Sequence, residues 1–368
     1  MSTKKDKFTS QDKQIMKLAF NIASSRKGLT GNNPSVGCVI TKKNQIISIG
    51  RTGLNGRPHA EYNAIEDCHE NLNGSKMYVT LEPCNHYGKT PPCTKKIIKS
   101  GISHIYYPIE DIDKKVKGKS FKILTKNKIK VHRGLLKSLS KDFYKSYKIN
   151  RNNKVPYVTG KIAVSKNNLI YSKKNRKITN EYSDKFTHVL RYKNDSILIT
   201  YKTLNKDNPK LNCRLKGLES FSPKKIVLDN KLNSKLNKFV ITKANKNNTI
   251  IFYNEASKSR ILHFKKKKIL LIKSRLDKNK YFYFQDVLKK LFKRGCRNLL
   301  IEGGGILTNN LIKKRVFNEF YLYKGQRDLS KFSDYLKFED FDLLRENYKK
   351  KINLKLKLGR DKITLFKK

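Results

Sequence analysis

The sequence is poor in acidic residues. It holds 29 Asp and Glu against 84 Lys and Arg, which gives a net charge of +55 over 368 residues. Such a charge attracts anions, which include nucleic acids, membrane surfaces and phosphorylated small molecules. The excess is spread along the whole chain and is mostly lysine, whereas a dedicated nucleic-acid site is expected to form a local patch. We therefore interpret it as a compositional bias with solvated lysines, and we expect no specific nucleic-acid partner.

The sequence also lacks a long apolar run. No segment approaches the roughly 18 apolar residues of a membrane-spanning helix, so we expect no membrane partner. Residues 1–28 contain no apolar core of a signal peptide, because Lys17 interrupts it. They predict instead an amphipathic helix capped by Thr9 or Ser10. Its apolar face is formed by Ile15, Leu18, Ala19 and Ile22.

Cysteine is scarce and irregularly spaced. The six cysteines form no regular disulfide framework, so a reducing cytoplasm is the expected location. In that compartment, clustered cysteine and histidine more often bind a metal or take part in catalysis than form disulfides. The cysteines are Cys38, Cys68, Cys84, Cys93, Cys213 and Cys296.

The length and the hydrophobic fraction predict two globular α/β domains. A chain of 368 residues suits two domains of about 150–200 residues, and 37% hydrophobic residues supply their cores. In the first half, helices are predicted at 59–72 and 93–102, and strands at 36–42, 45–51, 76–84 and 104–111. This β-α-β-α-β order predicts a sheet covered by helices.

The periodicity lapses at 148–156, so we predict domains at 1–150 and 151–368. The second half shows the same alternation of strands and helices, and its sequence contains no internal repeat. Residues 284–314 predict a helix, a strand, a glycine turn and a helix. Its other predicted strands lie at 157–165, 196–200, 224–229, 248–253 and 267–272.

One stretch of the first half predicts a catalytic metal site. Catalytic zinc takes three protein ligands of the histidine and cysteine type and leaves a fourth position open, and His59, Cys84 and Cys93 form such a set. The predicted helices begin near His59 and Cys93, and helix N-termini stabilise thiolates. Glu61 follows His59 by two residues. In zinc deaminases such a glutamate carries protons from the attacking water to the leaving amine.

The spacing of the two cysteines resembles that of a known enzyme family. The segments PCNHYGKTPPC at 83–93 and NNPSVGCVI at 32–40 resemble the deaminase half of the bifunctional riboflavin-biosynthesis deaminase/reductase family (the RibD type). The resemblance implies substrate contacts from Asn33, His86 and Lys89, with Lys89 near a phosphate. Thr52 departs from the pattern, because the family usually has a histidine there, and the departure implies the loss of a contact that orients a ligand.

The second half resembles the reductase half of the same family. The similar segments are PYVTGKIAVS, THVLRYKNDSILITYKTLNKDNPKLNCR and LLIEGGGILTNNLI. Three glycines between a strand and a helix let backbone amides approach a phosphate. The resemblance implies NADPH contacts from Ala163, Lys177, Thr203, Asp207, Asn230, Gly304, Gly305, Ile306, Leu307, Thr308, Asn309 and Asn310. It implies substrate contacts from Lys161, Arg191, Leu211, Arg214 and Glu302, and the arginines suit a phosphate.

The reductase motifs are less complete than the deaminase motifs. The segment SKNN at 165–168 stands where the family has SLDG, Asn208 replaces an aspartate, and Tyr201 replaces a small residue. We expect an active reductase with altered cofactor contacts, in which Lys166 and Lys202 offset lost hydrogen bonds by attracting the anionic cofactor.

The resemblance implies a cytidine-deaminase-like domain followed by a dihydrofolate-reductase-like domain. It implies hydrolytic deamination of 2,5-diamino-6-ribosylamino-4(3H)-pyrimidinone 5′-phosphate with one zinc ion per chain. It further implies reduction of the ribosyl group to ribityl with NADPH, by a homo-oligomer (dimer or tetramer). Three alternatives stay open. They are an active deaminase with an inactive reductase domain, an RNA-editing deaminase with a basic RNA-binding second half, and a structural zinc module in a nucleic-acid-binding scaffold.

Overall fold

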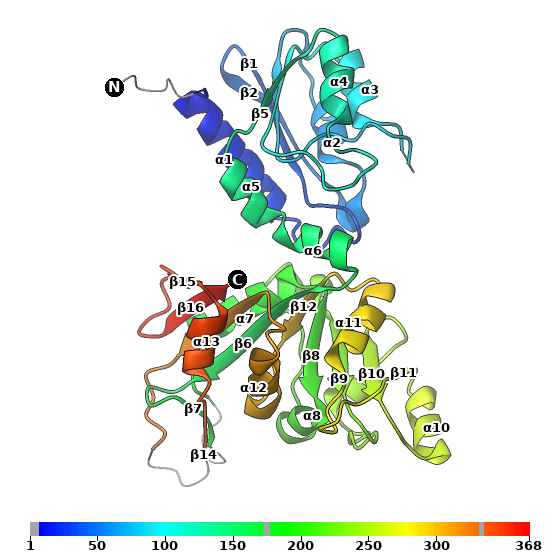
Figure 1. Ribbon diagram of the computed structural model, residues 1–368, viewed down its shortest axis with the longest axis vertical. Helices are drawn as coiled ribbons and strands as arrows, with labels where there is room; N and C mark the ends of the chain where they lie inside the picture. The colour runs from blue at the N-terminus through cyan, green and yellow to red at the C-terminus, as the bar shows by residue number, and fades with distance from the viewer. Residues whose placement is uncertain (1–6, 89, 173–176, 331–334) are drawn as a thin grey trace. The chain divides into compact units, whose positions relative to one another are not determined.

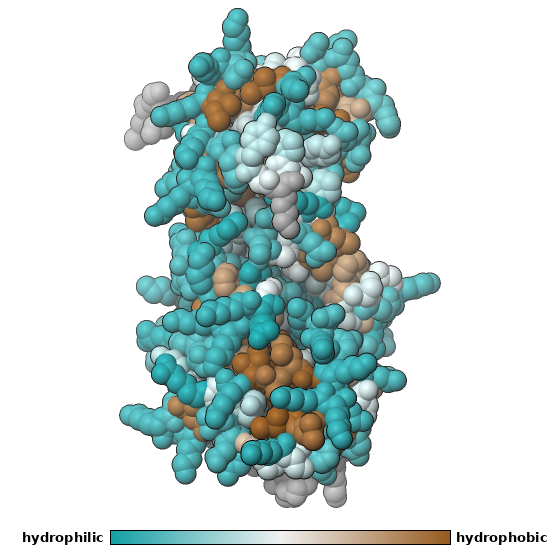
Figure 2. All heavy atoms as spheres, turned by 90° about the vertical axis from the view of Figure 1, so that its right-hand side faces the viewer, coloured by the Kyte–Doolittle hydropathy of each residue, from teal (hydrophilic) through white to brown (hydrophobic). Residues whose placement is uncertain are grey.

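The computed structural model describes residues 7–88, 90–172, 177–330 and 335–368 (Figure 1). The chain divides into two compact units, Met1–Lys154 and Val155–Lys368. Figure 2 shows hydrophilic side chains spread over the visible faces of both units rather than gathered in one stripe. None of the described helices combines the length and the apolar character that a membrane crossing requires.

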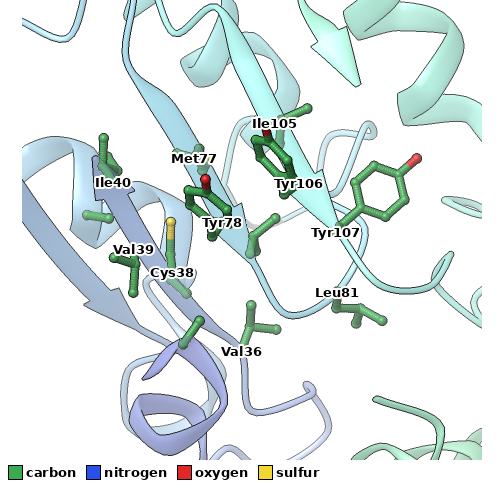
Figure 3. Packing of buried hydrophobic residues seen from close by; sticks show 14 of the residues in the cluster. Val36, Cys38, Val39, Ile40, Met77, Tyr78, Leu81, Ile105, Tyr106 and Tyr107 are labelled. Atoms are coloured by element: carbon green, nitrogen blue, oxygen red, sulfur yellow. The ribbon is translucent and has the colours of Figure 1, made fainter. Parts of the chain in front are cut away.

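The first unit is built on a five-stranded sheet in the order β2-β1-β3-β4-β5. Its strands are β1 (Gly37–Lys42), β2 (Gln45–Arg51), β3 (Lys76–Val79), β4 (His104–Tyr107) and β5 (Lys130–Arg133). Strand β1 pairs antiparallel with β2 and β3, whereas β3, β4 and β5 run parallel. Figure 3 shows apolar side chains of β1, β3 and β4 gathered in the core between sheet and helices.

Helices cover both faces of this sheet. They are α1 (Ser10–Ser24), α2 (Ala60–Glu66), α3 (Cys93–Lys99), α4 (Lys119–Lys126), α5 (Lys137–Phe143) and α6 (Lys145–Asn153), with a 3-10 turn η1 (Leu54–Gly56). Two glycines let α1 and α2 approach the sheet closely. A Cβ at Gly37 would lie 2.0 Å from the carbonyl oxygen of Ala19, and one at Gly50 would lie 2.2 Å from that of Ala60. Because the side chains at these positions point to opposite faces of the sheet, α1 and α2 lie on opposite faces.

Two sequence predictions for this unit need correction. The helix predicted at 59–72 ends at Glu66, because poor helix formers such as Asn71, Asn73 and Gly74 follow. Helix α1 begins after Thr9, as expected, but its buried face is rotated. Ile15 and Ala19 are buried as predicted, while Leu18 and Ile22 are only partly buried. The further buried residues of this face are Met16, Phe20 and Ala23.

The second unit is built on a nine-stranded sheet in the order β11-β10-β9-β8-β12-β6-β13-β16-β15. The first seven of these strands run parallel, and β16 and β15 add an antiparallel edge. The strands are β6 (Tyr157–Val164), β8 (Ser196–Thr200), β9 (Lys224–Leu228), β10 (Thr249–Tyr253), β11 (Leu270–Lys273), β12 (Asn298–Ile301), β13 (Glu319–Lys324), β15 (Lys350–Asn353) and β16 (Lys362–Lys367). A separate pair consists of β7 (Leu169–Ser172) and β14 (Tyr335–Lys337).

Both faces of the central strands are buried. On β8, Ile197 and Ile199 belong to one hydrophobic cluster and Leu198 belongs to another. This burial explains why the strand is a continuous apolar run, as is typical of parallel sheets. The covering elements are α7 (Glu181–Lys193), α8 (Tyr201–Asp207), η2 (Glu219–Phe221), α9 (Phe239–Thr242), α10 (Lys258–Lys266), α11 (Phe284–Lys293), α12 (Gly305–Lys313) and α13 (Phe341–Asn347).

Candidate active sites

The first unit brings the three predicted metal ligands together. His59 is the N-cap of α2, and Cys93 is the first residue of α3. The Nδ1 atom of His59 lies 3.2 Å from the Cys93 sulfur and 3.5 Å from the Cys84 sulfur. All three ligand atoms lie within 4.8 Å of one another. One histidine and two cysteines at these separations fit a tetrahedral zinc site with an open fourth position, since no further ligand joins this group among the described residues.

The local hydrogen bonds favour a thiolate at Cys84. The Cys93 side chain, then the His59 ring and the backbone N–H of Cys93, lower the pKa of Cys84 to about 4. That N–H lies 3.3 Å from the Cys84 sulfur and belongs to the first residue of α3. The N-terminus of a helix thus stabilises the charge that a metal ligand must carry.

Glu61 lies in the first turn of α2 and is 4% exposed. Burial raises the pKa of its carboxyl group to about 7. Glu61, His59 and Cys84 all line one small cavity of about 100 Å³. A carboxyl group with a pKa near neutrality beside a metal site can both accept and release a proton, which is the property that general acid–base catalysis needs.

The other residues predicted for the deaminase half differ in their position and in their hydrogen bonds. Asn33 and His86 line the same cavity, and Lys89 lies outside the described residues. The Nδ1 atom of His86 is buried and has no hydrogen-bond partner among the described residues, so it is available to a ligand. Asn33 donates to the carbonyl oxygen of Gly56 at 2.9 Å. Thr52 also lines the cavity, but its hydroxyl accepts the N–H of Val36 at 2.9 Å and thereby ties β2 to the segment before β1.

The sequence analysis missed a second group of residues around this cavity. Glu82 accepts the backbone N–H groups of Asp111, Gly118 and Ser120 at 3.0–3.1 Å and so fixes the loop after β4. Its place directly before Pro83 and Cys84 was the only available signal. The other residues of the group that line the cavity are Arg57, Asp111, Asp113, Tyr147 and Arg151.

The second unit has a much larger cavity of about 740 Å³. It lies where β6, β8, β9 and β12 end, at their carboxyl ends, which is where open α/β sheets bind ligands. Most predicted reductase residues line it: Lys161, Ala163, Thr203, Asp207, Leu211, Asn230, Glu302, Gly304, Gly305, Ile306, Leu307 and Asn310. Tyr201, the bulky departure from the family pattern, lines it as well.

The glycine turn at 303–305 lies close to Thr203 and Ile170, which also line this cavity. Gly304 is the N-cap of α12, and a Cβ there would lie 3.8 Å from the hydroxyl of Thr203. A Cβ at Gly305 would lie 2.9 Å from the Cδ1 atom of Ile170, so a larger residue there would displace the end of that side chain. The Oδ1 atom of Asn230, which also lines the cavity, is buried and has no partner among the described residues. The turn and Asn230 can therefore accept a phosphate-bearing cofactor without losing existing bonds.

Five predicted reductase residues do not line the cavity. Thr308 is buried and donates to the Gly303 carbonyl oxygen at 3.4 Å, and the buried Oδ1 atom of Asn309 has no partner among the described residues. Lys177 is exposed and lies 3.9 Å from Asp184. Arg214 is also exposed and donates to Asn212. The fifth residue is Arg191.

Arg191 makes an internal ion pair. Its guanidinium donates to both carboxylate oxygens of Glu302, at 2.8 and 2.9 Å, and to the carbonyl oxygen of Asn212 at 3.2 Å. Burial by itself would raise the pKa of Glu302, but Arg191 and Lys161 hold it below its usual value. These contacts orient Glu302 at the cavity. The predicted contact of Arg191 with a substrate phosphate stays a prediction.

The SKNN segment keeps a tight turn between β6 and β7. Asn168 has a φ of 65°, the left-handed region that favours glycine and tolerates asparagine, and it occupies the position of the glycine in SLDG. The side-chain oxygen of Asn167 accepts the Ser165 hydroxyl at 2.5 Å, and the Ser165 hydroxyl accepts the N–H of Leu169 at 2.9 Å. The SKNN sequence therefore forms a tight turn although it departs from SLDG.

Comparisons with known proteins find relatives for both units. Residues 9–109 match the family model described as the cytidine and deoxycytidylate deaminase zinc-binding region, and residues 156–325 match the RibD C-terminal domain. The riboflavin biosynthesis protein RibD of Aquifex aeolicus is 31% identical over 85% of this chain and 86% of its own length. The chain belongs to the RibD family. The RibD of Bacillus amyloliquefaciens is 33% identical over 85% of this chain and 84% of its own length.

A solved RibD-type structure is similar over nearly the whole chain. The deaminase/reductase of Thermotoga maritima superposes with a TM-score of 0.79 at 26% identity, and covers 97% of this chain and 98% of its own. The chain is thus a bifunctional RibD-type deaminase and reductase of riboflavin biosynthesis that uses zinc and NADPH. The second half is a reductase domain, which removes the support for an RNA-binding second half.

Proposed function

We propose that the first unit hydrolytically deaminates 2,5-diamino-6-ribosylamino-4(3H)-pyrimidinone 5′-phosphate and that the second reduces the ribosyl group of the product to ribityl. The Thermotoga relative is described as a diaminohydroxyphosphoribosylaminopyrimidine deaminase and 5-amino-6-(5-phosphoribosylamino)uracil reductase, which supports this substrate. The observation that carries the proposal is the meeting of His59, Cys84 and Cys93 with the buried carboxyl group of Glu61 in one cavity.

The residues of the first unit divide the work of deamination. When bound, zinc supplies the positive charge that activates a water molecule. His59, Cys84 and Cys93 would hold this ion, and Glu61 would accept a proton from the attacking water and pass it to the leaving amine. Because Glu61 is buried, bulk water does not compete for that proton. His86, with its unpartnered Nδ1, and Asn33 would orient the pyrimidine.

The second unit would bind cofactor and substrate side by side. When bound, NADPH supplies the hydride. The amides of the Gly303–Gly305 turn would bind the phosphates of NADPH at the N-terminus of α12. The buried Oδ1 atom of Asn230, which has no partner among the described residues, would accept a hydrogen bond from the cofactor. Lys161 and Glu302, which line the same cavity, would contact the substrate.

The decisive test supplies the pyrimidine phosphate and NADPH to the full chain at low salt. We expect ammonia release followed by NADPH oxidation in the same sample. Ammonia release without NADPH oxidation would leave a deaminase with an inactive reductase domain. Absence of both would contradict the proposal for this substrate.

The zinc ligands have a separate test. Cys84→Ala removes the ligand that the local hydrogen bonds keep ionised, so we expect loss of zinc and of ammonia release. NADPH oxidation with the deaminated substrate should persist. Metal analysis that finds full zinc occupancy in Cys84→Ala would remove Cys84 from the ligand set.

Two broader expectations belong to the same proposal. None of the six cysteines, all of which the structure describes, forms a disulfide, which supports a reducing cytoplasm as the place of action. Homo-oligomer formation stays a prediction, and light scattering of the purified chain would measure it.

A further inference from the structure

Three residues that carry or can carry positive charge surround the deaminase cavity. Arg57 precedes α2, His86 lies in the loop between the two ligand cysteines, and Arg151 belongs to α6. The sequence analysis assigned no role to either arginine. Both are only partly buried, so their guanidinium groups remain accessible from the cavity.

The acidic residues of the same cavity are mostly engaged elsewhere. Glu82 accepts three backbone N–H groups. Asp111 is buried and accepts the N–H of Asp113 at 2.9 Å and the hydroxyl of Tyr147 at 3.2 Å. Asp113 is the one that approaches an arginine, with its Oδ2 atom 3.6 Å from the Nη2 atom of Arg151.

The contacts of Arg151 orient it without saturating it. Its Nε donates to the Tyr147 hydroxyl at 3.3 Å, and its guanidinium carbon lies 5.3 Å from the centre of the Tyr147 ring. The separation of 3.6 Å from Asp113 exceeds a hydrogen bond, and both side chains are partly exposed, so this ion pair is weak. A dianionic group that enters the cavity can therefore replace Asp113 as the partner of Arg151.

Arg57 is held against the loop between Cys84 and Cys93. Its Nη1 donates to the hydroxyl of Thr90. Its Nη2 would lie 3.3 Å from a Cβ at Gly88, so a side chain at that position would crowd the guanidinium. The loop thus holds a second guanidinium at the same cavity.

We propose that Arg151 and Arg57 form the subsite for the 5′-phosphate of the deaminase substrate, with Asp113 as the resident counter-ion that the phosphate displaces. This inference rests on the proposed function. Guanidinium groups bind phosphate through paired charge-assisted hydrogen bonds, which makes arginine the suitable residue here. The residues that would bind the phosphate are therefore different from Glu61 and the candidate metal ligands, which would carry out the deamination.

The test compares the phosphorylated substrate with the same nucleoside without phosphate, and measures ammonia release from the full zinc-loaded chain. For Arg151→Gln and for Arg57→Gln we expect the KM for the phosphorylated substrate to rise by about 10- to 100-fold, because each removes hydrogen bonds between charged groups. The kcat for this substrate and both constants for the nucleoside should stay unchanged. Asp113→Asn keeps the shape and removes the competing charge, so the KM for the phosphorylated substrate should fall by about two- to fivefold.

Three controls make the outcomes distinct. Arg51→Gln removes the same charge at an exposed residue that bonds Ser25, and it should leave KM unchanged. NADPH oxidation with the deaminated phosphate should be unaffected in every variant, because the second unit binds that compound itself. Equal changes for the phosphorylated and dephosphorylated compounds, or no change in either, would overturn the phosphate subsite alone. No ammonia release from the unchanged chain would overturn the proposed function and the subsite together.

Discussion

The two cavities of this chain are organised in opposite ways. The deaminase cavity is about 100 Å³, and its candidate metal ligands and Glu61 lie within two short segments, 59–61 and 84–93. The reductase cavity is about 740 Å³ and draws on four strand ends far apart in the sequence. The first site needs a few side chains at fixed separations. The second needs a long surface that several elements build together, so single substitutions in it are tolerated more easily.

The largest expected effect is the loss of ammonia release when Glu61 in the deaminase cavity is replaced. Glu61→Gln keeps the shape of the side chain but cannot carry a proton, so ammonia release should fall by about 10²–10⁴-fold. Zinc content and NADPH oxidation with the deaminated substrate should remain normal, because neither depends on this proton. Near-normal ammonia release would show that another group carries the proton.

The next effect concerns the buried ion pair of the reductase site. Arg191→Met removes the partner of Glu302 and leaves a carboxylate in a buried place, which typically destabilises a protein by about 3–5 kcal/mol. Thermal unfolding should report a lower midpoint for the second unit, while zinc content stays normal. The double variant Arg191→Met/Glu302→Gln should recover part of the stability, since the carboxylate that lost its arginine partner is then removed as well.

That pair of variants also tests the original expectation for Arg191. If Arg191 contacts the substrate phosphate, its substitution should raise the KM for the substrate with little change in stability. A loss of stability that the double variant partly restores would identify Arg191 as a positioning residue for Glu302.

A smaller effect is expected at the turn between β6 and β7. Asn168→Ala replaces asparagine, which tolerates the left-handed region, with alanine, which disfavours it, at a φ of 65°, and this should cost about 1 kcal/mol. Asn168→Gly suits the same φ and serves as the matched control. Chemical denaturation of both variants measures the difference. Equal stability of the two would contradict the importance of the left-handed position.

The smallest effect concerns salt. Lys202, Lys206 and Lys280 line the reductase cavity and attract the anionic cofactor. Because charges in contact with solvent are screened within about 10 Å at 0.1 M salt, the KM for NADPH should rise several-fold between low and moderate salt. Lys202→Gln should make that dependence shallower, whereas a substitution at the exposed Lys266 on α10 should not. A KM for NADPH that is independent of salt would contradict this role of the lysines.

The candidate metal site was predictable from the sequence because two of its three candidate ligands, His59 and Cys93, lie at helix starts that the sequence itself marks. Pro92 precedes Cys93, and His59 precedes the first apolar residue of α2. Arg57 lies two residues before His59, but no sequence pattern related it, Asp113, Tyr147 or Arg151 to this cavity. Their meeting depends on α6 and the loop after β4 packing at the same cavity.

The sequence by itself determined the alternation of strands and helices, the candidate metal ligands with Glu61, and the glycine turn at 303–305. These features are local, because periodicity, caps and short spacings specify them within a few residues. The tertiary structure decided which side chains share a cavity. In it, Arg191 pairs with Glu302 and Arg151 lies beside Asp113. Asn168 adopts the left-handed φ that usually favours glycine. Contacts between residues more than a hundred positions apart, such as Arg191 and Glu302, arise from the packing of whole elements, which no local pattern encodes.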